Sequence, residues 1–413
     1  MAESIPRIGD EKPGLTSFPK EGLPENDVLK LLAEKVSQNV SPERNFANSY
    51  AGPTPPLALK AYSLGMNSLF VSGWGQDLYR GTYEMEKEAV RMVSSLLNLT
   101  AESSAGFITS GGTESNILAL RIAKLLSHKT KQPEIVMPCT AHSSLLSAAD
   151  LFGIKANLVE LNEEDYTPRM EQAERMINEN TIALVCSAPE AYFSGLDPVE
   201  EFAEIAEKRD LYLHVDAAWG GFIYPFMREL GYNIPPFDFG VAQVSSMTAD
   251  GHKLGILPIA CSFALFRSRS YLEAIPTEIV GPATITSTKN GGVAAAAWAM
   301  FQHLGREGYK NHVRNALDVT KTIADGVERI NGLRLVRKPS ITHVAYTTTD
   351  GLSVPEVYKG LRRKGWGTIM LKAPGPRPFQ YMRQAVHPYQ SKENAQRMLT
   401  DLEEAVRDAR NLV

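Results

Sequence analysis

The stretch TIALVCSAPEAYFSGLDPVEEFAEIAEKRDLYLHV, residues 181–215, contains the pattern of a strand, a helix and a second strand. Its ends, 181–187 and 211–215, are continuous apolar runs, which are typical of strands buried on both faces of a parallel sheet. Between them, Asp197 as N-cap, Pro198 at the first helical position and two acidic residues in the first turn predict a helix start. The apolar side of this helix, which we expect to face the sheet, comprises Val199, Phe202, Ile205 and Ala206. Strand–helix–strand alternation of this kind predicts an α/β fold.

The same alternation extends on both sides of this stretch. Strand-length apolar runs are found at 134–138, 241–246 and 262–267. Residues 83–97 and 112–126 have the pattern of helices, and the second of these follows a glycine-rich turn. We therefore expect helices packed on a sheet of mainly parallel strands.

The chain is predicted to have three parts, because its composition and periodicity change twice along its length. Residues 1–57 are rich in Pro and Gly and have one helical pattern at 27–36. They are either an arm that packs on a neighbour or on the main domain, or a partly disordered leader. Residues 58–300 are the expected large domain. Residues 301–413 contain long helices and a few strands and end in a capped helix near 391–412, which predicts a smaller domain.

The composition is that of a globular protein and argues against several classes of function. The 413 residues carry a formal net charge of -4, with 43% hydrophobic and 22% charged residues. This mildly acidic balance offers no basic surface for nucleic acid or anionic lipid. The longest apolar stretch, 255–266, has about a dozen residues, whereas a membrane span needs about 20. We therefore expect neither a nucleic-acid partner nor a membrane span.

The cysteines and the N-terminus bear on the compartment. Cys139, Cys186 and Cys261 are odd in number and form no C-x-x-C pair, which argues against a disulfide framework and a zinc site. The polar start MAESIPRIGDEKPG has no basic segment followed by an apolar one, so no signal peptide is expected. These features predict a cytoplasmic protein without a metal site.

A glycine-rich turn, TSGGTESN at 109–116, leads directly into the helix at 112–126. Glycines such as Gly111 and Gly112 let the backbone approach a ligand, and the free N–H groups at a helix start, here near Thr113, bind anions such as phosphate. The alternative is a helix cap with a tight turn. The motif is neither G-x-G-x-x-G nor the P-loop pattern, which disfavours dinucleotides and nucleoside triphosphates.

A carboxylate follows the second strand, in HVDAAWGG at 214–221. Asp216 stands where the carboxyl ends of parallel strands bind ligands, and it can keep a pyridine nitrogen protonated, which makes the ring an electron sink. The small Ala218 leaves room for such a ring to lie flat. Taken alone, Asp216 is better explained as the N-cap of a helix.

The segment TADGHKLG at 248–255 supplies a lysine after the next predicted strand. A lysine in a dry pocket loses proton affinity and becomes a nucleophile, which is the role we expect for Lys253. His252 can donate to a phosphate, and His142, in a loop after the run 134–138, can stack on a ring. The alternatives are a solvated surface lysine and a solvated loop histidine.

The order of a glycine-rich turn, a histidine, an aspartate and a lysine along one α/β chain resembles the fold-type I enzymes that use pyridoxal 5'-phosphate (PLP). Within them the chain is similar to the group II amino-acid decarboxylase and sphingosine-1-phosphate lyase superfamily, roughly over residues 45–400. The segments that carry this resemblance are 109–116, 187–206, 214–222, 236–255 and 291–309. The resemblance implies a large domain with a mostly parallel seven-stranded sheet flanked by helices, and a small C-terminal α+β domain.

The resemblance also implies roles for these residues. Lys253 forms a Schiff base with PLP, Asp216 pairs with the pyridinium nitrogen, and His142 stacks on the ring beside Ala218. The phosphate is bound by Gly111, Gly112, Thr113 and His252.

Further residues are implied to act on the substrate or across a dimer. Gly292, in the segment 287–292, reaches the phosphate of the partner's cofactor, which implies a homodimer with a shared site. Tyr192 is expected to move a proton as a catalytic residue, and Tyr50 to bind substrate from the arm. Arg383 matches an arginine of decarboxylase-like members that suits a carboxylate.

Two reactions compete, loss of CO₂ from an amino acid and retro-aldol loss of an aldehyde. The lyases carry a lysine six residues after the Schiff-base lysine, where this chain has Ile259, and an Asn and a His where it has 73–77 (GWGQD). A phosphorylated substrate loses charge-assisted contacts as a result. We therefore expect decarboxylation of a non-phosphorylated amino acid, with a sphingosine-1-phosphate-lyase-like aldehyde-lyase as the alternative. A third alternative, a catalytically idle binding partner, is disfavoured by the intact pair of Asp216 and Lys253.

Overall fold

The computed structural model describes residues 18–19, 21–48, 52–70, 75–100, 102–127, 131–276, 284–286, 289–375 and 377–411. The chain divides into two compact units, Met1–Ser41 and Pro42–Val413. The first contains helix α1 (Glu25–Val36), which matches the helical pattern predicted for the arm. The remaining elements belong to the second unit.

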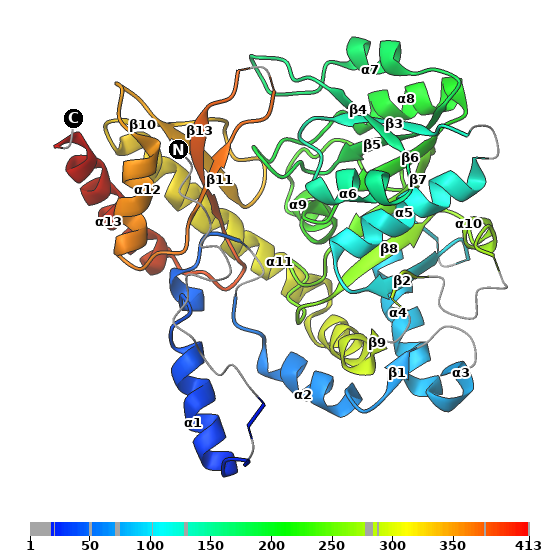
Figure 1. The fold of residues 1–413 in the computed structure, drawn as a ribbon, viewed down its shortest axis with the longest axis horizontal. Helices are drawn as coiled ribbons and strands as arrows, with labels where there is room; N and C mark the ends of the chain where they lie inside the picture. Colours follow the sequence, from blue (N-terminus) through cyan, green and yellow to red (C-terminus); the bar gives the residue numbers. More distant parts are fainter. Residues whose placement is uncertain are drawn as a thin grey trace. The chain divides into compact units, whose positions relative to one another are not determined.

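The second unit is built on a seven-stranded sheet, whose strands cross the centre of the green part of Figure 1. In spatial order the strands are β2 (Ala105–Thr109), β8 (Ser262–Phe266), β7 (Val244–Ala249), β6 (Tyr212–Asp216), β5 (Thr181–Ser187), β3 (Glu134–Pro138) and β4 (Lys155–Val159). Only β8 runs antiparallel to its neighbours, and the other pairs are parallel. The predicted α/β fold with a mostly parallel sheet is therefore confirmed.

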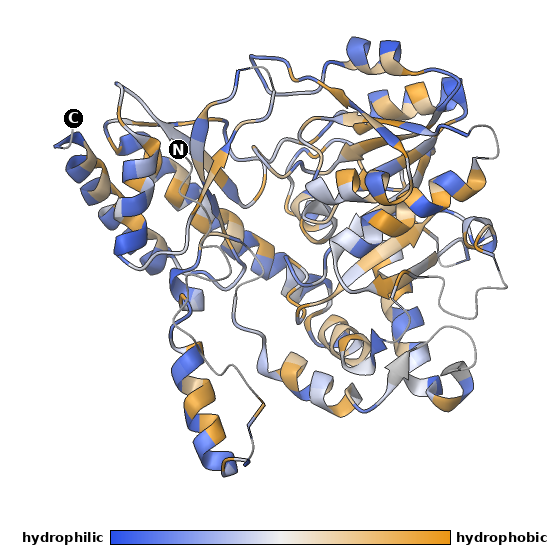
Figure 2. Ribbon diagram, in the orientation of Figure 1, coloured by the Kyte–Doolittle hydropathy of each residue, from blue (hydrophilic) through white to orange (hydrophobic). Residues whose placement is uncertain are grey.

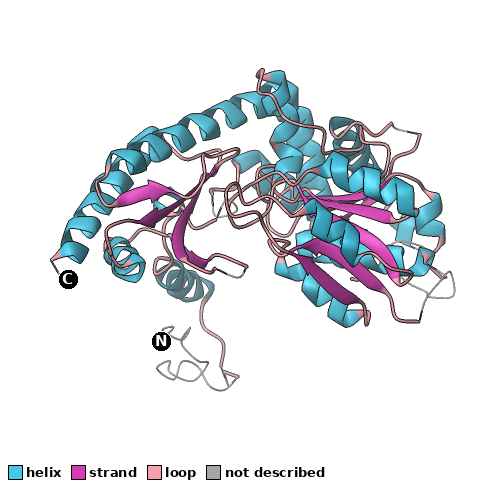
Figure 3. Ribbon diagram, turned by 90° about the horizontal axis from the view of Figure 1, so that it is seen from above, coloured by secondary structure: helices cyan, strands magenta, loops and turns pink. Residues whose placement is uncertain are grey.

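Helices cover both faces of this sheet (Figure 3). They are α4 (Arg80–Leu96), α5 (Gly112–Leu126), α6 (Ser143–Leu151), α7 (Met170–Met176), α8 (Val199–Arg209), α9 (Tyr224–Glu229) and α10 (Ser270–Glu273). The strands β3, β5, β6, β7 and β8 are buried along their whole length, and β8 is coloured hydrophobic in Figure 2. Burial from both faces explains why their sequences are continuous apolar runs.

The predicted start of α8 is corrected by the structure. The N-cap residue is Pro198 and not Asp197, and the helix begins at Val199. The carboxylate of Asp197 accepts instead from the backbone N–H of Ser187, over 2.7 Å, and thereby ties the end of β5 to the following loop. Burial raises the pKa of Asp197 well above its ordinary value. The buried face of α8 is as predicted.

Two predicted strands begin later in the structure. The strand expected at 211–215 is β6 at Tyr212–Asp216, and the one expected at 241–246 is β7 at Val244–Ala249. The delay of β7 has a local cause, because Asp238 Oδ1 accepts from Gly240 N over 3.0 Å and forms a turn there. Strands β2 and β4 were not predicted.

A long helix leads from the large sheet to a second sheet. Helix α11 (Gly291–Arg329) has a non-helical residue, Gly305, inside it. It packs against α2 (Pro56–Gly65), where a Cβ on Gly291 would lie 2.9 Å from the carbonyl oxygen of Gly65. The remaining short elements of this unit are the 3-10 helices Pro42–Arg44 and Gly220–Phe222, helix α3 (Gly75–Leu78), and strands β1 (Leu69–Phe70) and β9 (Lys289–Asn290). Since α11 crosses residue 300, the division expected there stays a prediction.

The second sheet is antiparallel and has four strands. Their order is β10 (Leu333–Leu335), β11 (His343–Thr348), β13 (Gln380–Ala385) and β12 (Ile369–Lys372). Helices α12 (Val354–Arg363) and α13 (Lys392–Arg410) pack with it, and Ser391 caps α13 as predicted. The implied small α+β domain is confirmed. Within the described residues, no helix is both long enough and apolar enough to cross a membrane.

Candidate active site

A cavity of about 870 Å³ lies at the carboxyl ends of the parallel strands. Ser187 and Asp216, the last residues of β5 and β6, line it together with Asp250, which directly follows β7. The opposite wall includes Ile369 and Arg383 from β12 and β13 of the second sheet. The carboxyl edge of an α/β sheet is where such folds bind ligands.

Asp216 is fixed by hydrogen bonds to both carboxylate oxygens. Its Oδ2 accepts from Asn116 Nδ2 over 2.8 Å, and its Oδ1 accepts from the backbone N–H of Ala218 over 3.1 Å. The residue is 5% exposed. The contact with Ala218 closes a local turn, but the next helix begins at Gly220 with Trp219 as its N-cap, so the N-cap interpretation of Asp216 is wrong. The buried carboxylate faces the cavity.

His142 lies across the cavity as the N-cap of α6. Its Nδ1 accepts from the backbone N–H of Ser144 over 3.2 Å and lies 2.8 Å from Ser144 Oγ. The residue is exposed to solvent and lines the cavity.

Lys253 is held inside the cavity by a carboxylate. Its Nζ lies 2.7 Å from Asp250 Oδ2 and 4.8 Å from the ring centroid of Trp219, and its side chain is 13% exposed. Burial by itself raises the pKa of Asp250, but Lys253 and His252 together hold that pKa below its ordinary value. The alternative of a solvated surface lysine is therefore wrong.

His252 is the other basic residue of this wall. Its Nδ1 accepts from the backbone N–H of Cys261 over 3.1 Å, and its Nε2 lies 3.7 Å from Asp250 Oδ2. Burial lowers the pKa of His252, which favours the neutral ring with its proton on Nε2. The Nε2–H group is thus oriented as a donor.

The glycine-rich turn and α5 border the same cavity. Gly111 is the N-cap of α5 with φ 151°, a backbone conformation that favours glycine. Glu114 braces the turn, because its carboxylate accepts from Ser110 N over 2.7 Å and from Thr286 N over 2.9 Å. Gly111, Gly112 and Thr113 all line the cavity, as predicted for an anion-binding turn.

Arg383 forms the charged part of the opposite wall. It is 8% exposed, its Nη1 donates to the carbonyl oxygen of Ala191, and its guanidinium carbon lies 5.7 Å from the ring centroid of Trp219. The loop that carries Ala191 is organised by Glu190, whose carboxylate accepts from the backbone N–H groups of Tyr192, Phe193 and Gly195. Burial raises the pKa of Glu190. Arg383 is thus a positioned residue and not a surface one.

Two predicted site residues lie elsewhere. Tyr192 is not among the described residues that line the cavity; its side chain packs with Phe193 and its carbonyl oxygen accepts from Tyr381 Oη over 3.0 Å. Gly292 opens α11, where a Cβ would lie 2.6 Å from the carbonyl oxygen of Tyr62. Tyr50 lies outside the described residues.

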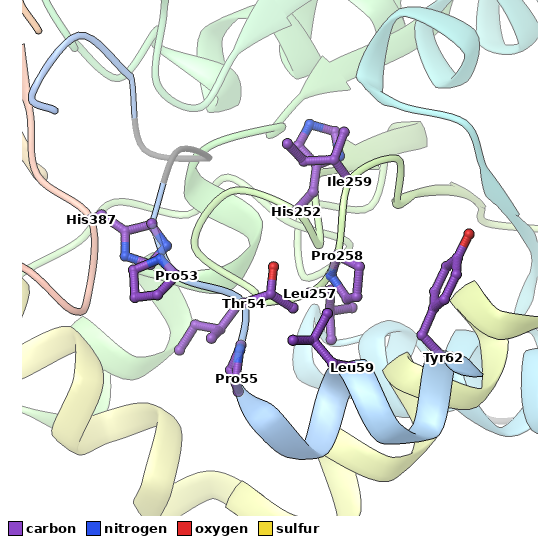
Figure 4. Close-up of a pocket in the computed structure, with 12 residues that line it drawn as sticks. Pro53, Thr54, Pro55, Leu59, Tyr62, His252, Leu257, Pro258, Ile259 and His387 are labelled. Carbon is purple, nitrogen blue, oxygen red and sulfur yellow. The ribbon is translucent and has the colours of Figure 1, made fainter. Parts of the chain in front are cut away.

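A second cavity, of about 470 Å³, adjoins the first through the shared residues His252 and Ile259 (Figure 4). In this view Leu59 and Tyr62 project from α2 on one side, and His387 stands on the other. Burial lowers the pKa of His387 to about 4. Ile259 stands at the position where the lyases carry a lysine, and it lines both cavities with an uncharged side chain.

Comparison with known proteins identifies the family. The model described as "Pyridoxal-dependent decarboxylase conserved domain" matches residues 26–349, which is most of the chain. The chain belongs to this family. As a member of the pyridoxal-dependent decarboxylase family it is a PLP-dependent carboxy-lyase, and the predicted cofactor and enzyme class are confirmed.

Individual relatives include both of the activities considered above. A protein of Thermococcus gammatolerans named "Probable L-aspartate decarboxylase" is 37% identical over 94% of this chain and 100% of its own length. The sphingosine-1-phosphate lyase of Oryza sativa is 37% identical over 77% of this chain and 61% of its own length. The structure of a sphingosine-1-phosphate lyase from Burkholderia pseudomallei superposes with a TM-score of 0.87 at 28% identity, covering 96% of this chain and 94% of that one.

The residues of this decarboxylase fit PLP. The turn before α5 borders the cavity, and position 112 must be glycine because a Cβ there would lie 2.7 Å from Asp250 Oδ1. The first N–H groups of a 15-residue helix point toward that space and attract an anion. Lys253 and the buried carboxylate of Asp216 line the same cavity and supply the amine and the partner for the ring nitrogen.

Sequence reasoning missed several residues of this site. Asn116 ends the quoted turn motif without an assigned role, Trp219 follows Asp216, and Asp250 precedes Lys253. Each of the three stands in a quoted motif, but only the structure shows their contacts with Asp216, Lys253 and Arg383. A signal was present for Asn116, because residues one turn into a helix lie on the same face as its first residue.

Proposed function

We propose that this enzyme removes the α-carboxylate of a small acidic amino acid, with L-aspartate as the substrate. The observation that carries this proposal is Arg383, whose guanidinium lines the cavity opposite Lys253. Planar guanidinium groups bind carboxylates in bidentate geometry. Relatives named for aspartate decarboxylation that match nearly the whole chain support the same choice of substrate.

The seven-stranded sheet side of the cavity holds the cofactor in this proposal. Bound PLP supplies an electron sink for the electrons of the broken bond. Gly111, Gly112, Thr113 and His252 bind its phosphate, and Lys253 supplies the amine. Asp216 would accept a hydrogen bond from the ring N–H, and the imidazole of His142 and the small side chain of Ala218 would lie beside the ring.

The other wall orients the substrate. Which bond breaks depends on which one stands perpendicular to the cofactor ring, so a fixed contact with the α-carboxylate favours loss of CO₂. Arg383 is itself fixed by the carbonyl oxygen of Ala191 and the ring of Trp219. It is therefore placed to hold the α-carboxylate in one orientation. Tyr192 acts, in this proposal, through the loop that positions Ala191, and Tyr50 stays a predicted substrate contact.

Two polar side chains near Arg383 are candidates for the second carboxylate of aspartate. Thr368 lines the cavity, and its Oγ1 accepts from Gln384 Nε2 over 2.8 Å, which leaves its own O–H to donate. Asn48 also lines the cavity, and its amide NH₂ group is of the kind that donates to a carboxylate. An amide and a hydroxyl suit a short carboxylate side chain.

An aldehyde-lyase of the sphingosine-1-phosphate type is the second candidate, and the likeness to the lyase structures favours it. Such a substrate brings a phosphate dianion into the cavity. Ile259 is uncharged and 62% exposed at the position where the lyases carry lysine. The other departure, at 73–77, lies partly outside the described residues. The missing cation favours the decarboxylase.

The enzyme is proposed to act as a cytoplasmic homodimer. Large apolar side chains are exposed around the openings of the two cavities, among them Leu59 at 53%, Ile259 at 62% and Ile285 at 44%. A partner subunit covers such a surface in many dimers. The cysteines Cys139 and Cys186 are unpaired, as a reducing cytoplasm keeps them.

The test is a product assay on the PLP-reconstituted protein. It is incubated with carboxyl-labelled amino acids and, separately, with a phosphorylated long-chain amino alcohol. Labelled CO₂ from L-aspartate without aldehyde supports the proposal. Aldehyde without CO₂ overturns it and assigns the lyase activity. CO₂ from neutral amino acids but not from aspartate contradicts the substrate.

A further inference from the structure

Asn116 is a buried residue whose side chain hydrogen-bonds to Asp216, one of the residues assigned to the cofactor. It is 1% exposed and lies one turn into α5. Its amide oxygen Oδ1 accepts from Thr248 Oγ1 over 2.7 Å and lies 3.0 Å from His214 Nε2. Its amide nitrogen Nδ2 donates to Asp216 Oδ2 over 2.8 Å and to Ser144 Oγ over 2.9 Å. All four hydrogen-bonding positions of the amide are therefore used.

The contacts of the amide oxygen fix which way the side chain points. Burial lowers the pKa of His214 to about 4, so this imidazole is neutral and carries one proton. Its Nδ1 lies 2.8 Å from Ser246 Oγ, which can donate to it. With the proton on Nε2, His214 and Thr248 both donate to Asn116 Oδ1. A flipped amide would place an NH₂ group against these two donors and lose both bonds.

The contacts of the amide nitrogen reach two residues that flank the cavity. One hydrogen goes to the carboxylate of Asp216. The other goes to Ser144, whose Oγ–H then donates to His142 Nδ1, a nitrogen that also accepts from Ser144 N. Since Nδ1 accepts twice, the proton of a neutral His142 resides on Nε2. The amide nitrogen can only donate, so it determines which atom donates and which accepts in each hydrogen bond of this network.

We propose that Asn116 is a positioning residue that fixes the Asp216 carboxylate and the Nε2–H tautomer of His142 in one hydrogen-bond network before PLP binds. The inference rests on the proposed roles of Asp216 and His142. One amide serves both because α5 packs against β6, which ends at Asp216, and against α6, whose N-cap is His142. A buried network with every member satisfied holds a single arrangement, whereas a partly satisfied one does not.

The test replaces the donor without changing its shape. In Asn116→Asp, a carboxylate oxygen faces Asp216 Oδ2 in place of an N–H group, so a bond becomes a repulsion between like charges. We expect the dissociation constant of PLP, measured by absorbance titration of the cofactor-free protein, to rise about 100-fold. An unchanged dissociation constant overturns the proposal.

The matched control is Asn98→Asp. Asn98 Nδ2 donates to Asp238 Oδ2 over 3.0 Å, which is the same pairing of side chains away from the cavity. This variant is expected to lower the thermal unfolding temperature while leaving PLP affinity within about twofold of wild type, since Asn98 contacts no cavity residue. An equal loss of PLP affinity in both variants assigns the effect to general destabilisation and overturns the proposal.

A second readout keeps the proposal testable where Asn116→Asp fails to fold. Nitrogen NMR of the histidine rings in the cofactor-free protein reports which ring nitrogen of His142 carries the proton. In Thr248→Val, one of two bonds that orient the amide is lost, and we expect about a fivefold weaker PLP binding and a mixture of His142 tautomers. If Thr248→Val shows only the Nε2–H tautomer of His142 and binds PLP with wild-type affinity, the proposal is wrong. Neither readout uses aspartate turnover, so a wrong substrate assignment leaves this test unaffected.

Discussion

The cavity wall formed by the seven-stranded sheet is densely hydrogen-bonded, whereas the wall formed by the four-stranded sheet holds, among the described residues, one charged side chain and few polar groups. On the first wall, Asp216 and Asn116 are tied to neighbours at every polar atom but the positions facing the cavity. On the second wall, Arg383 has the carbonyl oxygen of Ala191 and the face of Trp219. The two walls therefore differ in how much each side chain depends on its neighbours.

The difference follows from what each wall binds in the proposed function. The cofactor is the same in every turnover, and a rigid, fully satisfied site binds it at little cost in ordering. The substrate must enter and leave, and its identity depends on a small number of contacts. Substitutions on the first wall are thus expected to affect all reactions of the enzyme, and those on the second wall to affect the choice of substrate.

The largest effect is expected at Lys253. The change Lys253→Ala removes the amine, so we expect turnover to fall by at least about 10⁴-fold and no PLP to be trapped on the protein by borohydride. Activity is measured by release of labelled CO₂. Lys155→Ala, an exposed lysine whose side chain is 66% exposed, is the control and should keep full activity. Substantial turnover by Lys253→Ala would sink the assignment of this wall.

The next effect is expected at Asp216. The change Asp216→Ala leaves the phosphate contacts and the amine, so some PLP should still bind. Loss of a buried charged partner costs about 3–4 kcal/mol, which is about 10²–10³-fold in turnover. The comparison of kcat with the PLP dissociation constant separates the two roles. Near-normal kcat would rule out a role for this carboxylate at the ring nitrogen.

A smaller and more selective effect is expected at Arg383. The change Arg383→Lys keeps the charge but loses the planar pair of donors, so kcat/KM for aspartate should fall about 10–100-fold while PLP affinity stays near wild type. Arg377→Ala is the control, because Arg377 is exposed and pairs with Glu163 over 2.7 Å. If Arg383→Lys weakens PLP binding as much as it lowers kcat/KM, the proposed separation of the two walls is wrong.

The last effect concerns acid stability rather than activity and lies outside both walls. Burial lowers the pKa of His387 from 6.5 to about 4, so the unfolded chain binds a proton in this range that the folded chain does not. Stability is therefore lost as the pH falls from about 6.5 to about 4, by up to about 3 kcal/mol from this residue. His387→Gln removes the titration.

Chemical denaturation of the cofactor-free protein at several pH values checks this expectation. The difference in unfolding free energy between wild type and His387→Gln should change across the acid range and stay constant above about pH 7. A constant difference at every pH would show that His387 is not held neutral by the fold.

Much of the fold was predictable because buried helices and strands have apolar patterns that can be recognised in the sequence. The limits of α5, β3 and β5 were predicted to the residue, since each is an apolar or amphipathic segment bounded by polar or glycine residues. The start of α8 was displaced because Asp197 bonds to Ser187, outside the local pattern, and the start of β7 because Asp238 forms a turn with Gly240. Rules that read helix and strand starts from neighbouring residues fail where a side chain bonds to a more distant partner.

The sequence by itself determined the α/β class, the order of the chemical motifs and the residues Lys253, Asp216 and His142, since each follows a buried strand and the strand ends of a parallel sheet meet at one edge. Only the tertiary structure decided that Arg383 from β13 faces that edge, that Tyr192 does not, and that Asn116 joins Asp216 to His142. The physical reason is that hydrogen bonds between residues 100 or more positions apart depend on packing between elements, which no local pattern records.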